Sequence, residues 1–414
     1  MNEADRGATT QASETSAGSY RWFLLAGIWL VYFCFGMTIA AMAPLVAPIT
    51  RDLGLSHAAM GAVLGAWPLV YIASAIPCGA FLDRVGPRWA LFLAALVIAL
   101  SGLLRGLAGS HLELFLAVAV FGLGGPLVSI GGPKLIAYFF EGKTRALAMG
   151  IYITGPATGG ILALAATNAV MMPFFDGDWR RVLLAYAGFV LIASLAWLAI
   201  GAHPEGRAFE RRLAAEARTR QIEVFLALLG LPAVRLVLLM SVGMFFFNHG
   251  LNNWLPEILR TGGMAAAEAG FWAAVPTAVG VLGSLVIPRL AVPQRRIRIL
   301  LGLFLAAAAA TLLLQSPLLP LLGTGLVLQG VARGSMMTIA VLVLLETPEV
   351  GARYAGLAGG LFFSAAEVGG VMGPLTVGYL SDLTGGFAAA LYLMTAVMAA
   401  LVVLLARLKR YQGG

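Results

Sequence analysis

Long apolar runs separated by short polar turns occupy almost the whole chain. A helix needs about 20 apolar residues to cross the hydrocarbon core of a bilayer. Runs of that length are expected at residues 22–46, 58–80, 88–107, 112–139, 145–169, 181–201, 234–256, 266–288, 297–315, 319–345, 354–379 and 386–407. The chain has no alternating strand pattern, and backbone groups in lipid must be paired internally, so the pattern predicts twelve transmembrane helices.

The composition is that of a protein whose solvent is lipid. Of the 414 residues, 60% are hydrophobic and 11% are charged, and the mean hydropathy is +0.91. A soluble domain carries about 25% charged residues. The net charge of +8 does not indicate nucleic acid, because bases in cytoplasmic loops account for it. The two cysteines, Cys34 and Cys78, lie in apolar runs, so we expect neither disulfides nor a metal cluster, and no cofactor.

The distribution of bases predicts the orientation of the chain. With the N-terminus inside, the inner loops hold most of the arginines and lysines. The outer loops then hold only Arg51, Arg105, Arg180, Arg181 and Arg260. This asymmetry predicts a multi-pass protein of the cell (inner) membrane with both termini in the cytoplasm.

The longest polar interval divides the chain into two halves. Residues 202–233 are expected to form a cytoplasmic linker with a surface helix, between six-helix bundles at 21–201 and 234–407. Residues 1–20 and 408–414 are expected to be cytoplasmic tails, the first of them disordered. Gly150, Gly159 and Gly160 recur at one constant offset as Gly360, Gly369 and Gly370, which is typical of a duplicated unit.

A short charged turn joins the second and third apolar runs. Gly86 permits a tight reversal, and Pro87 suits the first turn of the next helix. The pattern Gly-x-x-x-Asp-Arg-x-Gly-x-Arg is formed by Gly79, Asp83, Arg84, Gly86 and Arg88. Placed between these two runs, it resembles the signature loop of the major facilitator superfamily. We call residues 79–88 the signature turn.

The resemblance covers the chain after residue 20 and implies an all-α membrane fold of two pseudo-symmetric six-helix bundles. It also implies that Asp83 and its neighbours latch the inner face of the outward-open state. The negative Asp83 can meet the positive N-terminal end of the eleventh span, near Arg353. In the second half, the stretch 283–289 keeps a glycine and a base but lacks the acid, so the turn is not expected to be repeated there.

Two charges lie near the middle of the membrane, Arg333 in the tenth span and Glu367 in the eleventh. Because burying a charge in lipid costs several kcal/mol, both should face the interior. The functional interpretation assigns substrate-anion binding to Arg333 and proton coupling to Glu367. The structural alternative is an ion pair that joins the two spans. Lys134, nearer the inner end of the fourth span, either extends to the interface or forms a gate or second anion contact.

The seventh span is unusually polar for a membrane helix. Asn248, His249 and Asn252 are candidate substrate-binding residues, and Gly250 suggests a loosened helix that lines a cavity. Hydrogen bonding between helices is the alternative. Four aromatic residues could line the same cavity, although packing explains each of them singly: Tyr32, Trp67, Tyr71 and Phe363.

The fifth span carries a kinkable small-residue motif formed by Gly155, Pro156, Gly159 and Gly160. It resembles the Gly-Pro-x-x-Gly-Gly motif of drug/proton antiporters in the same superfamily. However, the basic residue that these antiporters carry in the middle of the fourth span has no counterpart here. The segments 254–256 and 268–270 are similar to the cyanate and nitrate/nitrite porter branches.

Together these features predict a secondary transporter, not an enzyme, that moves a small organic or inorganic anion with protons by alternating access. No nucleotide-binding motif is present to drive it. A metabolite or drug efflux antiporter is the first alternative, and a receptor or scaffold on the same fold is the second. The expected partners are a small-molecule substrate, protons and the lipid bilayer, without nucleic acid, and the protein is expected to be a monomer.

Overall fold

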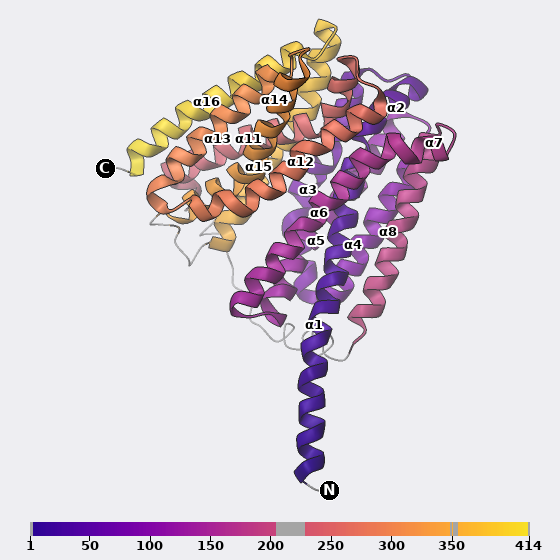
Figure 1. The fold of residues 1–414 in the computed structure, drawn as a ribbon, viewed down its shortest axis with the longest axis vertical. Helices are drawn as coiled ribbons and strands as arrows, with labels where there is room; N and C mark the ends of the chain where they lie inside the picture. The colour runs from indigo at the N-terminus through magenta and orange to yellow at the C-terminus, as the bar shows by residue number, and fades with distance from the viewer. Residues whose placement is uncertain (1–2, 204–227, 348–349, 351–354, 413–414) are drawn as a thin grey trace.

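The computed structural model describes residues 3–203, 228–347, 350 and 355–412, and these are almost entirely helical (Figure 1). Within these ranges, 12 helices are long and apolar enough to cross a membrane, which confirms the prediction from the apolar runs. The first half consists of α1 (Glu3–Ala40), the 3-10 turn η1 (Ala43–Leu45), α2 (Val46–Leu53), α3 (His57–Val85), α4 (Pro87–Leu107), α5 (His111–Phe139), α6 (Gly142–Ala166), the π-helical η2 (Thr167–Met171), α7 (Met172–Phe174) and α8 (Trp179–Gly201). The second half consists of α11 (Pro232–Thr261), α12 (Ala266–Leu290), α13 (Pro293–Leu313), α14 (Leu319–Leu345), α15 (Ala355–Thr384) and α16 (Ala388–Gln412).

The N-terminal segment differs from its expected form. Residues 3–20 continue α1 as one helix that projects from the bundle, whereas their composition predicted a disordered tail (Figure 1). No proline interrupts this stretch, so the helix of the first span can continue through it. Most of the predicted surface helix at 203–221 lies outside the described residues.

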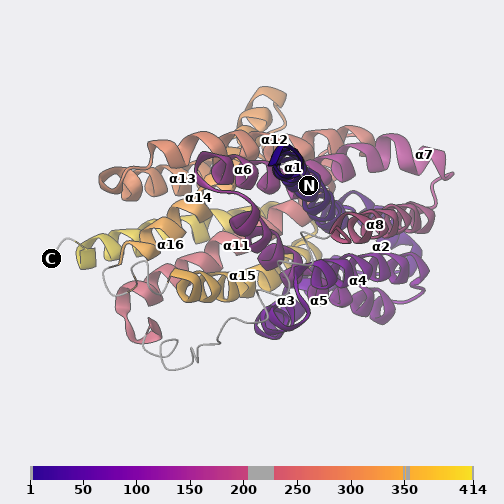
Figure 2. The same cartoon turned by 90° about the horizontal axis from the view of Figure 1, so that it is seen from below.

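The helices form two bundles of six long helices each, joined along two helix pairs. Between the bundles, α3 packs against α15 and α6 packs against α12 (Figure 2). The bundles converge at the end of α3 that carries His57 and diverge toward the end that carries Asp83 (Figure 1). We call these the His57 end and the Asp83 end.

Glycine contacts distinguish the two ends of this interface. Toward the His57 end, a Cβ added at Gly61 would lie 2.5 Å from the Pro374 carbonyl oxygen of α15. Near the Asp83 end, a Cβ at Gly79 of α3 would have nothing within 4 Å, and the same holds at Gly359 of α15. The two helices therefore touch backbone to backbone at one end only.

The glycines that recur between the halves make matching contacts. A Cβ at Gly159 of α6 would lie 2.1 Å from the Phe33 carbonyl oxygen of α1, and one at Gly369 of α15 would lie 1.9 Å from that of Val242 in α11. Each glycine therefore lets the fifth helix of its half approach the backbone of the first. This equivalence supports the expected duplication of a six-helix unit.

Arg105 does not lie in an outer loop as expected. It is in the last turn of α4 and is 1% exposed, and its Nη1 donates a 2.9 Å hydrogen bond to the Thr38 carbonyl oxygen. Its guanidinium also lies over the Phe121 ring, 5.5 Å from the centroid. Because Thr38 is in the last turn of α1, Arg105 places a positive charge at the negative end of that helix.

Replacing Gly369 with alanine should destabilise the protein, because the new methyl group would overlap the Val242 carbonyl oxygen. Overpacking of this kind costs about 1–3 kcal/mol. Gly360→Ala is the matched control, since a Cβ there meets nothing within 4 Å and lies on the same helix. Thermal unfolding in detergent should show a lower midpoint for Gly369→Ala only. Equal midpoints for the two variants would contradict the proposed close approach.

Candidate functional site

Aromatic rings from both bundles form one connected network where the bundles meet. In the first bundle, Tyr32 stacks on Tyr152 with ring centroids 4.4 Å apart and continues to Phe35 at 5.5 Å. Phe35 then contacts Trp67 at 6.4 Å, and Trp67 contacts Tyr71 at 6.1 Å. The structure therefore brings together three of the four predicted aromatic residues.

The network crosses between the bundles at the ring pair Trp67 of α3 and His249 of α11. Their centroids are 5.3 Å apart with an interplanar angle of 27°, so the rings are stacked. On its other side, His249 stacks on Phe245 at 5.3 Å. Phe245 in turn contacts Phe363 of α15, at 6.4 Å, which adds the fourth predicted aromatic residue.

Glu367 lies beside His249, with its Oε2 atom 3.9 Å from His249 Nε2. Glu367 is 5% exposed, and its Oε2 is buried without a hydrogen-bond partner among the described residues. Gly370 makes room for this pair, because a Cβ there would lie 2.5 Å from Glu367 Oε2 and 3.0 Å from His249 Nδ1. An intramembrane carboxyl group in such a setting is a candidate for binding a proton.

Arg333 reaches the same region from α14. Its Nη1 donates a 2.7 Å hydrogen bond to the Thr277 hydroxyl of α12, and α14 packs against α11, which carries His249. No ion pair with Glu367 occurs among the described residues, so the predicted structural pair is not formed here. The arginine therefore keeps donors available for an anion. Sequence reasoning missed Thr277, whose only signal was a hydroxyl in an apolar run.

The seventh span differs from its predicted form. α11 is one continuous helix from Pro232 to Thr261, not a loosened one. Gly250 instead allows close packing, because a Cβ there would lie 2.3 Å from Met394 Cε. The Oδ1 atom of Asn248 is buried without a hydrogen-bond partner in the described part of the chain, whereas Asn252 is half-buried. The seventh span thus contributes His249 to the interface from within a continuous helix.

The signature turn has the predicted backbone but an unexpected partner. Gly86 has φ of 86° and caps α3, and Pro87 begins α4, as the sequence predicted. Asp83 Oδ1 lies 2.6 Å from Lys134 Nζ of α5, in the same bundle. Lys134 is therefore the ion-pair partner of Asp83, a role that sequence reasoning did not assign to it. Arg353, the expected neighbour of Asp83, lies outside the described residues.

The other residues of the signature turn make local contacts. The guanidinium of Arg88 lies 5.0 Å from the Trp89 ring centroid, and the Arg88 carbonyl oxygen accepts a 2.9 Å hydrogen bond from Trp197 Nε1. Arg84 is in the last turn of α3. The signature turn thus joins α3 to α5 and α4 to α8.

The Gly-Pro-x-x-Gly-Gly motif of α6 packs against α1. A Cβ at Gly36 would lie 2.0 Å from the Pro156 carbonyl oxygen, and one at Gly155 would lie 3.1 Å from that of Trp29. Gly160 is buried in the same contact. The motif therefore acts here as a surface for close helix approach.

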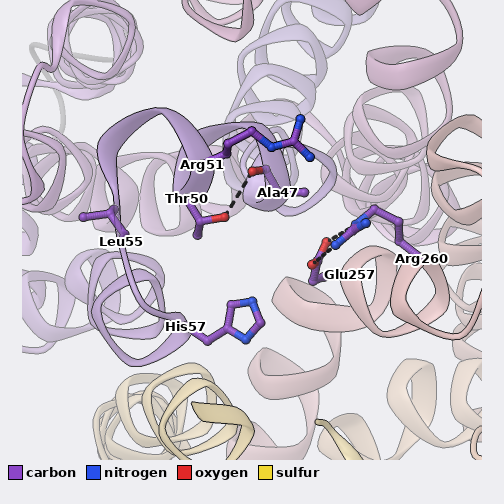
Figure 3. Close-up of a pocket in the computed structure, with 7 residues that line it drawn as sticks. All are labelled: Ala47, Thr50, Arg51, Leu55, His57, Glu257 and Arg260. Atoms are coloured by element: carbon purple, nitrogen blue, oxygen red, sulfur yellow. Dashed lines mark hydrogen bonds and ion pairs between the residues drawn. The ribbon is translucent and has the colours of Figure 1, made fainter. Parts of the chain in front are cut away.

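A polar pocket of about 320 Å³ opens at the His57 end, between the bundles. Figure 3 shows Arg51 and His57 of the first bundle facing Glu257 and Arg260 of α11 across it. Glu257 is 4% exposed and accepts hydrogen bonds of 2.8 and 2.7 Å from Arg260. The pocket is separate from the His249 network and lies at the rim of the molecule.

Comparison with known proteins gives one consistent family. The model of the Major Facilitator Superfamily matches residues 28–363. The chain is 27% identical to the uncharacterized transporter YycB of Bacillus subtilis, over 91% of this chain and 90% of that protein. It is 26% identical to the D-galactonate transporter of Escherichia coli, over 92% and 93%. The crystal structure of a bacterial homolog of the human lysosomal transporter Spinster superposes with a TM-score of 0.71 and 18% identity, covering 94% and 97%.

Proposed function

The chain belongs to the Major Facilitator Superfamily, and we propose that it transports a small organic or inorganic anion together with protons by alternating access. The family and the structural neighbours are transporters and not enzymes. The single observation that carries the proposal is the buried Glu367 carboxyl group, whose Oε2 lies 3.9 Å from His249 Nε2 and has no hydrogen-bond partner among the described residues. A scaffold would gain nothing from the desolvation cost of these groups.

The anion site is proposed at Arg333. Its guanidinium stays charged, and the one hydrogen bond it donates, to Thr277, leaves further donors for a carboxylate. The similarity to the D-galactonate transporter, which aligns over nearly its whole length, supports an organic anion as the substrate class. Asn248, with an unpaired buried Oδ1, and Asn252 are the proposed polar contacts for the rest of the substrate.

Proton binding is proposed at Glu367. When an anion approaches Arg333, a charged Glu367 would repel it, and protonation removes that repulsion. Proton and anion then enter the site together, which is symport. His249 lies beside Glu367 and stacks on Trp67 of the other bundle. A change in the protonation of Glu367 would therefore act on the interface between the bundles through the His249 ring.

The orientation predicted by the bases indicates to which side of the membrane the structure is open. With both termini in the cytoplasm, the Asp83 end faces the cytoplasm, and the divergence of the bundles there corresponds to an inward-open state. Opening to the other side requires the contacts of the His57 end to separate. Rocking about the interface between α3 and α15 would expose the Arg333 and Glu367 site to each side in turn.

A proton-coupled efflux antiporter is the second candidate. The observation in its favour is the Gly-Pro-x-x-Gly-Gly motif of α6. In an antiporter, an inward proton gradient drives substrate out of the cell, whereas in a symporter it drives substrate in. Transport assays in proteoliposomes of known orientation separate the two by the direction of accumulation.

Glu367→Gln should retain anion exchange but lose accumulation driven by a pH gradient, because glutamine cannot take up the coupled proton. Arg333→Gln should weaken anion binding by about 10–100-fold, the effect of losing a hydrogen bond to a charged group. Both are measured in proteoliposomes, by uptake with an imposed pH gradient and by exchange without one.

Glu257→Gln is the matched control for this experiment. Glu257 is also a buried carboxylate, but its ion pair with Arg260 lies at the His57 end. This variant should be less stable and still accumulate substrate. Full proton-driven uptake by Glu367→Gln would remove the coupling role of Glu367.

Labelling from outside intact cells tests the orientation. In a variant without native cysteines, Leu112→Cys at the start of α5 should react with an impermeant maleimide, since it lies at the His57 end. Lys143→Cys at the start of α6 should react only after permeabilisation. The reverse pattern would show that the termini lie outside.

A further inference from the structure

Part of the pattern of the signature turn, its two glycines and its aspartate, occurs a second time, at the end of α15. Residues 79–86 read Gly-x-x-x-Asp-x-x-Gly, and so do residues 378–385. Asp83 lies two residues before Val85, the end of α3, and Asp382 lies two residues before Thr384, the end of α15. Gly86 and Gly385 both have positive φ, of 86° and 72°. The stretch 283–289 lacks the acid, and the shorter pattern follows the eleventh span instead, without the two arginines of the signature turn.

The second turn, Gly378–Gly385, holds the first residues of α3 across the interface between the bundles. Asp382 accepts hydrogen bonds from the backbone N–H groups of His57, at 3.0 Å, and Ala58, at 2.7 Å. The side chains of Ser381 and His57 are also hydrogen-bonded, at 2.9 Å. Ser56 caps the next N–H group of α3, that of Ala59, at 3.1 Å. Two of the first three free amides of α3 are thus satisfied by the opposite bundle.

Gly378 makes this approach possible. A Cβ there would lie 2.1 Å from the His57 carbonyl oxygen and 2.9 Å from Trp254 Cζ2. The equivalent Gly79 of the signature turn has nothing within 4 Å, and Asp83 is paired with Lys134 of its own bundle. One turn is therefore engaged across the interface in this structure, and the other is not.

We propose that Gly378–Gly385 is a second latch, at which Asp382 caps α3 across the bundles and stabilises the state closed at the His57 end. Opening that end breaks the cap. The antiparallel pair α3 and α15 then carries one acidic turn at each end, and each turn stabilises a different state of the transporter. The inference rests on the proposed alternating access but not on the identity of the substrate.

The physical chemistry of the contact suits a latch that must release. A carboxylate at a helix N-terminus is favoured both by the unpaired N–H groups and by the helix dipole. The side chain of Asp382 is 35% exposed, so water can replace its hydrogen bonds when the bundles part. A deeply buried ion pair would make separation far more costly.

Asp382→Asn should shift the protein toward the state open at the His57 end. Spin labels at Leu112→Cys and Ala388→Cys report the separation of the bundles at that end, and labels at Lys143→Cys and Gln294→Cys report the Asp83 end. The distances between the labels are measured by double electron–electron resonance on the full chain in nanodiscs, with Cys34 and Cys78 replaced. Asparagine keeps one acceptor oxygen but loses the second and the negative charge, so the ratio of the two populations should change on the order of tenfold, as for the loss of a hydrogen bond to a charged group.

Asp178→Asn is the matched control. Asp178 also caps a helix, accepting hydrogen bonds from the N–H groups of Arg180 and Arg181, but it caps α8 within one bundle. That variant removes the same charge from a helix start and should leave both distance distributions unchanged. Gly378→Ala is a second test of the latch, because the new methyl group would displace the start of α3. It should shift the two populations in the same direction as Asp382→Asn, and it replaces that variant if Asp382→Asn folds poorly.

Unchanged distances in both Asp382→Asn and Gly378→Ala would overturn the proposal and leave Asp382 with a purely local structural contact. Because these distances need no substrate, they are independent of the transport assay on Glu367→Gln. A shift in distances without proton-coupled uptake would support the latch and count against the proposed coupling alone.

Discussion

The contact between α3 and α15 is the interaction on which the rest of the molecule depends. It must hold two bundles together at one end and yet come apart without unfolding either bundle. Backbone contacts at Gly61 and Gly378 meet the first requirement, because glycine lets two helices approach closely. Lipid tails are as apolar as the side chains, so helix association in a membrane depends on such close packing. Helix-end hydrogen bonds to Asp382 meet the second, since water can take their place.

The polar centre of the protein depends on that same interface. His249 lies between Phe245 of its own bundle and Trp67 of the other, and it is also the neighbour of Glu367. The groups that would bind a proton and an anion lie on helices of the second bundle, and the stacked Trp67 connects them to the first.

The sequence predicted the parts of this structure that local chemistry determines. Hydropathy gave the twelve spans, because only a helix can cross lipid, and the glycine and proline at 86 and 87 gave the turn between α3 and α4. Composition did not predict the helix at residues 3–20, and the polarity of the seventh span wrongly suggested a broken helix. Most of the candidate substrate-binding residues lie close together in the structure. The sequence could point to them because few polar or charged residues occur within apolar spans.

The pairs that join distant segments could not be predicted in the same way. Asp83 with Lys134, Arg333 with Thr277 and His57 with Asp382 are set by how the helices pack, which one sequence without relatives does not report. The repeated pattern at 378–385 was present in the sequence, but its meaning depends on α3 and α15 lying antiparallel. Packing geometry, and not composition, assigns each acid its partner.

Arg105 has a consequence for how the chain enters the membrane. An arginine at the centre of an inserting helix costs about 2.5–3.5 kcal/mol, and less near an end. Here Nη1 of the guanidinium donates to the carbonyl oxygen of Thr38, in a helix that leaves the ribosome earlier than α4, whereas Nε and Nη2 have no hydrogen-bond partner among the described residues. The order of synthesis places the acceptor in the bilayer before the charge arrives. We therefore expect α4 to enter the bilayer against α1 rather than alone.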